Sequence, residues 1–207
     1  METAELAGTV VFAVSGVFAV AERRLDWFGA IVVGMATALG GGTVRDLILG
    51  INPVFWVKDP TFLLAALAGA LAAIGAAYLP RLAARGFEGV LQLADAGGLA
   101  VFAVVGALIA IDHDVATGVV VVIAVISGVG GGVTRDLLAG RTPLVMRQEI
   151  YATAALAGAL VIVGLDELTD AGETAAAFAG GITVFGLRLA GIRRSWSLPS
   201  LGTNEAG

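Results

Sequence analysis

The chain has 207 residues, of which 58% are hydrophobic and 14% are charged, and its mean hydropathy is +0.94. A soluble domain carries about 25% charged residues, so this composition excludes a water-soluble globule and predicts an all-α integral membrane protein. The formal net charge of −5 argues against a nucleic-acid partner.

Seven apolar stretches are candidates for membrane spans, because crossing the hydrocarbon core takes about 20 residues. The first run, Leu6 to Ala21, has no lysine or arginine before it and is expected to be a span, not a cleaved signal peptide. We expect one transmembrane domain over residues 1–194 and a flexible cytoplasmic tail over 195–207. The predicted spans are 5–21, 28–50, 61–79, 93–111, 115–139, 149–165 and 172–190.

The basic residues predict the orientation. If the N-terminus lies on one side of the membrane, Lys58 falls on that side and nine arginines fall on the other. Cytoplasmic loops carry the excess of lysine and arginine, so we expect a plasma-membrane protein with its N-terminus outside and its C-terminus in the cytoplasm. The nine arginines are Arg23, Arg24, Arg81, Arg85, Arg141, Arg147, Arg188, Arg193 and Arg194.

The sequence repeats itself at an offset of 90 residues. The stretch "GGGTVRDLILG" at 40–50 returns as "GGGVTRDLLAG" at 130–140, and Glu5 corresponds to Asp95. Each repeat, about 5–79 and 93–165, holds three spans, and this odd number makes the second copy enter the membrane from the opposite side. The pattern predicts two inverted three-helix repeats with a seventh helix added. Such repeats build transporters and channels with their site near the membrane midplane.

The duplicated motif supplies the candidate site. Three successive glycines disfavour a helix by about 1 kcal/mol each, so we expect a kink or break there. Charged residues inside spans mark functional pathways, and Arg45 and Arg135 lie about 9 Å on either side of the midplane. Because Asp46 and Asp136 point about 100° away from them on a helix, each arginine is expected to pair across the bundle, with freed carbonyls, an aspartate of the other repeat or Asp95. The predicted pore or gate residues are Gly40, Gly41, Gly42, Thr43, Arg45, Asp46, Gly130, Gly131, Gly132, Thr134, Arg135 and Asp136.

Several readings of these residues stay open. The two threonines of the motif either line a pore or bond back to their own helices. Asp95 is either a charge partner or an interfacial residue, and Glu5 is expected to be solvated. Lys58 and Asp59 are interfacial or line an outer mouth. Two alternatives to an ion pathway stay open. The arginines could form structural ion pairs, and the glycines could serve helix packing alone.

The motif also resembles the nucleotide-binding signature of tRNA nucleotidyltransferases and poly(A) polymerases. Those enzymes need an Asp-x-Asp pair soon after the motif to hold Mg²⁺, and "INPVFWVKDP" has none. The motif also occurs twice within apolar spans. We therefore expect no enzyme activity, no catalytic residues, no cofactor and no resident metal.

The duplicated GGGxxRD motif, "FAVSG" and "FAVVG" in the first and fourth spans, and "NPVFWVKDP" resemble the prokaryotic trimeric intracellular cation (TRIC) channel family. Its bacterial and archaeal members are also known as glycine-transporter-like proteins. The resemblance implies a homotrimer with one pore in each protomer, lined by glycine-kinked second and fifth spans. It also implies transient passage of K⁺ and Na⁺, with membrane lipid as a further partner. Animal members carry Lys-Glu-Val in place of Arg-Asp, so their lipid regulation is not carried over.

Two functions remain. One is a potassium-permeable channel, and the other is a secondary transporter of a small zwitterion such as glycine. A transporter would use the same broken helices to hold carboxylate and ammonium groups.

Overall fold

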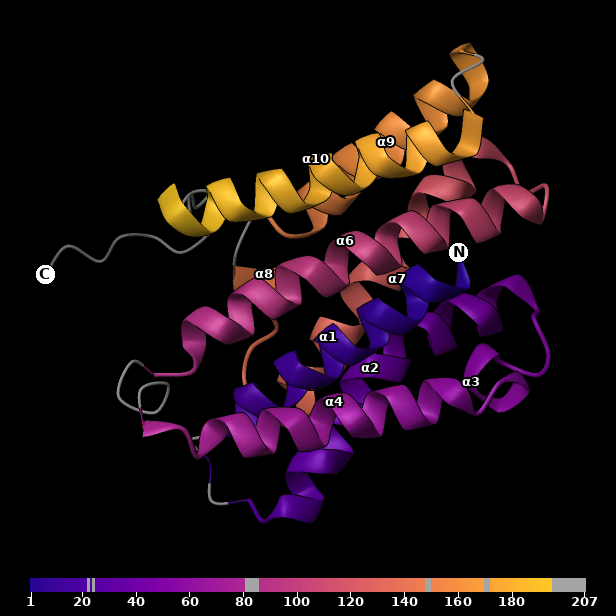
Figure 1. Ribbon diagram of the computed structural model, residues 1–207. Coiled ribbons are helices and arrows are strands. Elements are labelled where there is room, and N and C mark those ends of the chain that lie inside the picture. Colours follow the sequence, from indigo (N-terminus) through magenta and orange to yellow (C-terminus); the bar gives the residue numbers. More distant parts are fainter. Residues whose placement is uncertain (22, 24, 81–85, 148–149, 170–171, 195–207) are drawn as a thin grey trace, which may run out of the picture.

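The computed structural model describes residues 1–21, 23, 25–80, 86–147, 150–169 and 172–194. Within these residues the chain forms nine helices and no strand, so the predicted all-helical architecture is confirmed (Figure 1). The predicted tail at 195–207, together with Arg24, Arg81 and Arg85, lies outside the described residues. The helices are α1 (Glu2–Val20), α2 (Trp27–Leu49), α3 (Phe55–Lys58), α4 (Thr61–Ala77), α6 (Glu88–Asp112), α7 (Thr117–Leu138), α8 (Leu144–Arg147), α9 (Ala152–Leu168) and α10 (Gly172–Arg194).

Each predicted span overlaps one of the seven long helices. Five of them, α1, α2, α6, α7 and α10, are long and apolar enough to cross a membrane, while α4 and α9 have 17 residues each. The count of seven spans therefore stays a prediction. The four-residue helices α3 and α8 lie between predicted spans, and they follow the two copies of the glycine motif.

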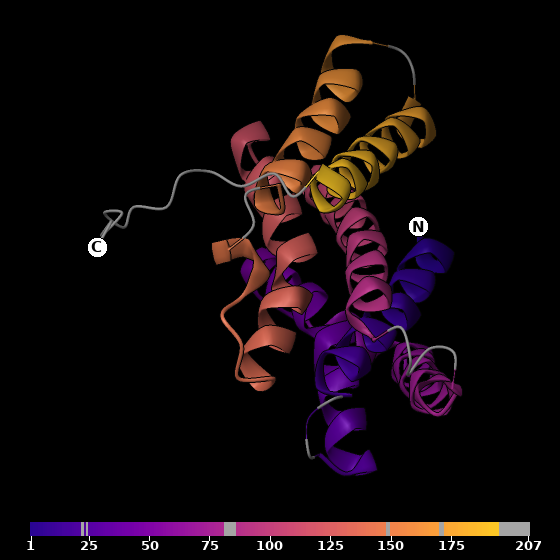
Figure 2. The same cartoon turned by 90° about the vertical axis from the view of Figure 1, so that its left-hand side faces the viewer.

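The two halves of the chain lie side by side. Helices α1 and α2 of the first half pack against α6 and α7 of the second, while α4 and α9 lie on the outer flanks. Figure 1 shows α4 at one edge of the molecule and α9 and α10 at the other, and Figure 2 shows the same order from the end. The seventh long helix, α10, packs on α9 and α6. It is the element of this bundle that the sequence repeat does not duplicate.

Equivalent residues of the two repeats meet at the centre. The rings of Phe12 and Phe102, which are 90 residues apart, stack with their centroids 5.3 Å apart. A Cβ atom added to Gly98 would strike the ring of Phe12, and one added to Gly8 would lie 3.2 Å from Cε2 of Phe102. Each phenylalanine therefore rests on a glycine of the opposite repeat, as expected where a pseudo-twofold axis passes between equivalent positions.

The glycine triplets form the crossing of α2 and α7. A Cβ on Gly41 would overlap the carbonyl oxygen of Ser127, one on Gly130 would lie 2.9 Å from Cα of Gly41, and one on Gly131 would lie 2.6 Å from the carbonyl oxygen of Thr37. The predicted break is wrong, because both helices stay α-helical through their triplets. Small residues allow two membrane helices to approach closely, and here that gain outweighs their poor helix propensity.

Both glycine-bearing helices end in the same way. Gly50 and Gly140 have φ angles of 70° and 61°, a left-handed conformation that glycine adopts without steric cost. The next backbone amides turn back, so that Ile51 N donates to the carbonyl of Asp46 and Arg141 N to that of Asp136, both at 2.8 Å. These turns bring the starts of α3 and α8 back over the motif.

Replacing Gly41 with alanine should destabilise the protein, because the new methyl group meets backbone that cannot rotate away. Overpacking of this kind costs about 1–3 kcal/mol. The measurement is the thermal unfolding midpoint of the purified protein in detergent.

The matched control is Gly164→Ala in α9, where an added Cβ meets nothing within 4 Å. The midpoint should fall for Gly41→Ala and stay level or rise for Gly164→Ala. Equal midpoints would show that the crossing of α2 and α7 does not depend on the missing side chain.

Candidate functional site

The first-repeat cluster consists of Glu5 on α1 and of Arg45 and Asp46 on α2. Arg45 donates from Nη1 to Oε1 of Glu5 and from Nε to Oδ1 of Asp46, both at 2.8 Å. Its guanidinium carbon lies 5.5 Å from the ring centroid of Phe55. Arg45 and Asp46 are each 1% exposed and Glu5 is 7% exposed, so a fully paired cation is buried between α1 and α2.

The second-repeat cluster consists of Asp95 on α6, Arg135 and Asp136 on α7, and Arg188 on α10. Arg135 donates from Nη1 to Oδ1 of Asp95 at 2.6 Å and to Oγ of Ser15 at 2.7 Å, and from Nε to Oδ1 of Asp136 at 2.8 Å. Nη2 of Arg188 lies 3.8 Å from Oδ2 of Asp95. Asp95 and Arg135 are 0% exposed.

The second carboxylate oxygen of each motif aspartate anchors the following short helix. Oδ2 of Asp46 accepts from the backbone N of Phe55 at 2.7 Å, and Oδ2 of Asp136 accepts from that of Leu144 at 2.8 Å. In both repeats the aspartate therefore bonds to the arginine of the motif through one oxygen and to the start of the following short helix through the other. This correspondence shows that the repeat preserves the site as well as the helices.

Two expectations about these charges are wrong. Asp46 and Asp136 do not point away from their arginines, because the long arginine side chain folds back far enough to reach the short carboxylate beside it. Glu5 is not solvated, because Arg45 holds it inside the bundle. Each arginine does pair with a carboxylate of a neighbouring helix: Arg135 with the anticipated Asp95, and Arg45 with Glu5, which was not among the expected partners.

Sequence reasoning missed three side chains at this site: Arg188 of the second-repeat cluster, and Ser15 and Tyr151, which bond to members of the cluster. Tyr151 donates its hydroxyl to Oδ1 of Asp95 at 2.9 Å, and its ring lies 4.8 Å from the guanidinium carbon of Arg188. Arg188 was counted among the cytoplasmic arginines, whereas it is 1% exposed within α10. The position of Arg188 inside an apolar span could have identified it as a site residue from the sequence. No comparable sequence signal pointed to Tyr151 or Ser15.

Nη2 of Arg135 and Oδ2 of Asp95 are buried and make no hydrogen bond within the described part of the chain. Buried polar atoms are nearly always satisfied in proteins, and an exception calls for an explanation such as strain or a functional role.

The threonines of the motif bond back to their own helices. Thr43 donates to the carbonyl of Leu39 at 2.7 Å and Thr134 to that of Gly130 at 2.9 Å. Thr43 also accepts from the indole N–H of Trp56 at 3.0 Å. Both hydroxyls therefore donate within their own helices, the second of the two readings left open.

Lys58 and Asp59 lie at the end of α3. Lys58 is exposed, and Oδ1 of Asp59 accepts from the backbone N of Thr61 at 2.9 Å, next to the start of α4. Hydrogen bonds from the Thr61 backbone, and then from its hydroxyl, hold the pKa of Asp59 below its ordinary value. The Asp59 carboxylate therefore accepts hydrogen bonds from the first residue of α4.

The chain is similar to known membrane proteins over most of its length. A family model described as "Glycine transporter" matches residues 2–78 and 92–167. The UPF0126 inner membrane protein YadS of Escherichia coli K12 is 40% identical over 203 residues, which cover 98% of this chain and 97% of the relative. A UPF0126 membrane protein of Deinococcus radiodurans is 46% identical over 157 residues, 75% of this chain and 71% of the relative.

Two solved structures are similar over nearly the whole chain. The TRIC trimeric intracellular cation channel orthologue from Rhodobacter sphaeroides superposes with a TM-score of 0.86 at 36% identity, over 94% of this chain and 97% of that one. A TRIC cation channel structure that addresses conductance gives a TM-score of 0.85 at 31% identity, over 100% and 99%.

Replacing Asp95 with asparagine should destabilise the protein more than replacing Glu5 with glutamine. Asp95 faces two guanidinium groups, Arg135 and Arg188, whereas Glu5 faces one. Removing one partner of a buried ion pair costs about 3–5 kcal/mol, because the other charge stays buried. The measurement is again the thermal unfolding midpoint in detergent.

Replacing Arg188 with methionine in the Asp95→Asn background provides the control, since it removes the excess positive charge. We expect the double variant to recover part of the lost midpoint. A double variant no more stable than Asp95→Asn, or a midpoint for Asp95→Asn equal to that of Glu5→Gln, would contradict this account.

Proposed function

The chain belongs to the family that includes the UPF0126 membrane proteins and the TRIC cation channels, described by the glycine-transporter model, and on that premise we propose that it is a monovalent-cation channel permeable to potassium. The solved relatives are cation channels and not enzymes. The observation that carries the proposal is the pair of buried arginine–carboxylate clusters, one near the C-terminal end of α2 and one near that of α7.

The proposed pathway runs beside the crossing of α2 and α7. Because the second repeat is inverted, Arg45 and Arg135 stand at opposite depths in the membrane and a permeating ion meets them in turn. Each guanidinium fills the space between its helices, so a hydrated cation must displace it. We therefore assign the described arrangement to a closed state, in which a basic side chain blocks the pathway and opening moves it aside.

The charges favour a cation over an anion. In the first-repeat cluster two carboxylates, of Glu5 and Asp46, face the single guanidinium of Arg45. At the end of the bundle where α6 and α9 end and α7 begins, Asp114, Asp166 and Glu167 line a hollow of about 230 Å³. Acidic side chains of this kind raise the local concentration of cations.

We propose roles for the motif residues as parts of this pathway and its gate. The glycines set the spacing of α2 and α7, the arginines form the gate, and the aspartates anchor it. The residues are Gly40, Gly41, Gly42, Thr43, Arg45, Asp46, Gly130, Gly131, Gly132, Thr134, Arg135 and Asp136, with Asp95 as charge partner. Lys58 and Asp59 are proposed for the outer mouth.

The assembly and placement follow from the same premise. We propose a homotrimer with one pore in each protomer, because the Rhodobacter sphaeroides relative is described as trimeric. Each protomer is proposed to be a single transmembrane domain over residues 1–194. The Escherichia coli relative is an inner membrane protein, which supports the plasma membrane. Without Arg188, eight arginines still lie opposite Lys58, and this excess supports an outer N-terminus.

A secondary transporter of a small zwitterion is the other candidate, and the description of the matching family model favours it. A transporter would need an open carboxylate and an open cation to hold glycine. In both clusters the carboxylates and guanidinium groups already pair with one another. Nη2 of Arg135 and Oδ2 of Asp95, which make no hydrogen bond among the described residues, belong to side chains that are paired in this way, which favours the channel.

Purified protein in planar bilayers should pass discrete currents that reverse near the potassium equilibrium potential in a potassium gradient. Replacing Arg45 or Arg135 with alanine should raise the open probability several-fold, because the blocking side chain is gone. Single-channel recording measures both quantities.

The matched control is Arg193→Ala, an exposed arginine at the end of α10, which should leave the currents unchanged. Absence of current together with saturable uptake of labelled glycine would sink the channel proposal. Currents unaltered in the Arg45→Ala/Arg135→Ala double variant would assign both arginines to bracing the helices. Native mass spectrometry of the same preparation should give three chains per particle.

A further inference from the structure

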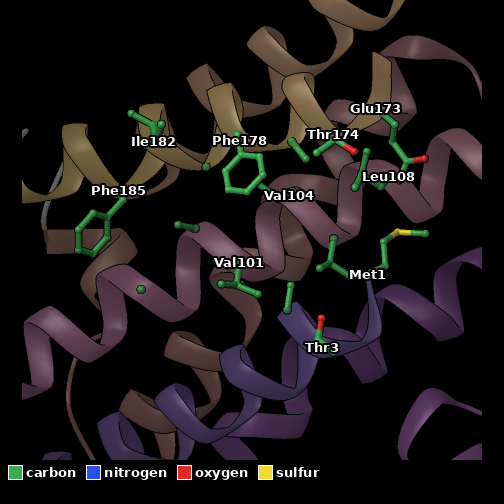
Figure 3. A pocket seen from close by; sticks show the side chains of 16 residues that line it. Met1, Thr3, Val101, Val104, Leu108, Glu173, Thr174, Phe178, Ile182 and Phe185 are labelled. Atoms are coloured by element: carbon green, nitrogen blue, oxygen red, sulfur yellow. The ribbon is translucent and has the colours of Figure 1, made fainter. Parts of the chain in front are cut away.

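A groove of about 650 Å³ lies between the N-terminal end of α1, the second half of α6 and the first half of α10 (Figure 3). Its walls are apolar, formed by residues such as Val101, Val104, Phe178, Ile182 and Phe185. Phe178 and Ile182 are 68% and 72% exposed, so the described residues leave these two side chains of the wall largely uncovered. The volume falls in the range of sites for organic ligands.

The groove is polar at one end only. Met1, Thr3, Glu173 and Thr174 gather at the end where α1 and α10 begin, while Phe185 marks the apolar end, as Figure 3 shows. Glu173 is the charged side chain among the residues that line it. The groove thus matches a molecule with a polar head and a long apolar tail.

The length of the groove matches one leaflet of a membrane. From Thr174 to Phe185 is eleven residues along α10, or about 16 Å at 1.5 Å per residue. The hydrocarbon core is about 30 Å thick, so one leaflet is about half of that. The polar end lies at the helix starts and the apolar end near the middle of α10, which is the depth reached by one acyl chain.

We propose that the groove holds one acyl chain of a membrane phospholipid, from the leaflet in which α1 and α10 begin. The acidic Glu173 selects an ammonium-bearing head group, such as ethanolamine, over an anionic one. Moving a tail from the bilayer into the groove gains no hydrophobic free energy, because both surroundings are apolar. The chain is held by close contacts with the groove walls and by the contact of its head group with Glu173.

The test is native mass spectrometry of delipidated protein titrated with phosphatidylethanolamine. In Gly181→Leu an added Cβ would lie 3.5 Å from Cγ2 of Val104, an ordinary contact, and the rest of the side chain fills the groove. In Ala4→Phe the groove is filled from the opposite wall. Both variants should lose one bound phospholipid per chain, or bind it at least tenfold more weakly.

The matched control is Gly186→Leu, on the same helix but outside the groove, where an added Cβ meets nothing within 4 Å. It should bind lipid as the wild-type chain does. Glu173→Gln should abolish the preference for phosphatidylethanolamine over phosphatidylglycerol and leave the number of bound lipids unchanged.

Two results would overturn the proposal. One is an unchanged lipid count in both Gly181→Leu and Ala4→Phe. The other is loss of the oligomer in these variants with no lipid bound to the wild-type groove, which would make the groove an interface between copies of the chain. Neither result bears on whether the protein conducts ions.

Discussion

A guanidinium group buried inside a membrane bundle must be paired, and this requirement organises the molecule. Arg45 and Arg135 are excluded from water, and an unpaired charge at that depth is costly. Each therefore requires the carboxylate beside it and a second one from a neighbouring helix, Glu5 or Asp95. These pairs fix how α1 packs on α2 and how α6 packs on α7.

The glycines make this pairing possible. They bring α2 and α7 close enough for their backbones to touch, and Gly42 and Gly132 leave room for the rings of Phe55 and Tyr151 beside the charges. The same motif therefore provides both the close crossing and the charged group next to it. This coupling explains why the glycines and the Arg-Asp pair recur together at an offset of 90 residues.

The two clusters are related but not equal. At the offset of 89 that relates "AALAGAL" in the two halves, Phe62 stands where the second repeat has Tyr151, so the first repeat lacks the hydroxyl that bonds Asp95. It also lacks a counterpart of α10, which brings Arg188 to the second-repeat cluster. The first-repeat cluster therefore keeps an excess of carboxylate. In the proposed channel the first-repeat cluster attracts the cation, and the second-repeat cluster forms the more strongly stabilised closed gate.

Hydropathy and the repeat were enough to predict the seven long helices, the inverted halves and the two motif arginines, Arg45 and Arg135, because each rests on a local pattern. The partner of Arg45 was missed because Glu5 lies near the chain start, where a carboxylate is usually solvated. Arg188 was missed because α10 has no copy in the repeat, so no register pointed to its position. Tyr151 was missed because its counterpart in the first repeat is Phe62, which has no polar group. The helix break was wrong because local propensity was given more weight than packing between helices.

The central claim is that Arg135 covers a pathway that conducting ions use. Ser15, whose hydroxyl accepts from Arg135 and which is 0% exposed, tests it directly. The chain has no cysteine, so Ser15→Cys introduces a single thiol. Applied to conducting channels, a cationic thiol reagent should irreversibly reduce the potassium current of this variant and leave that of the cysteine-free chain unchanged. A Ser15→Cys channel that conducts and is unaffected by prolonged exposure to the reagent would contradict the account.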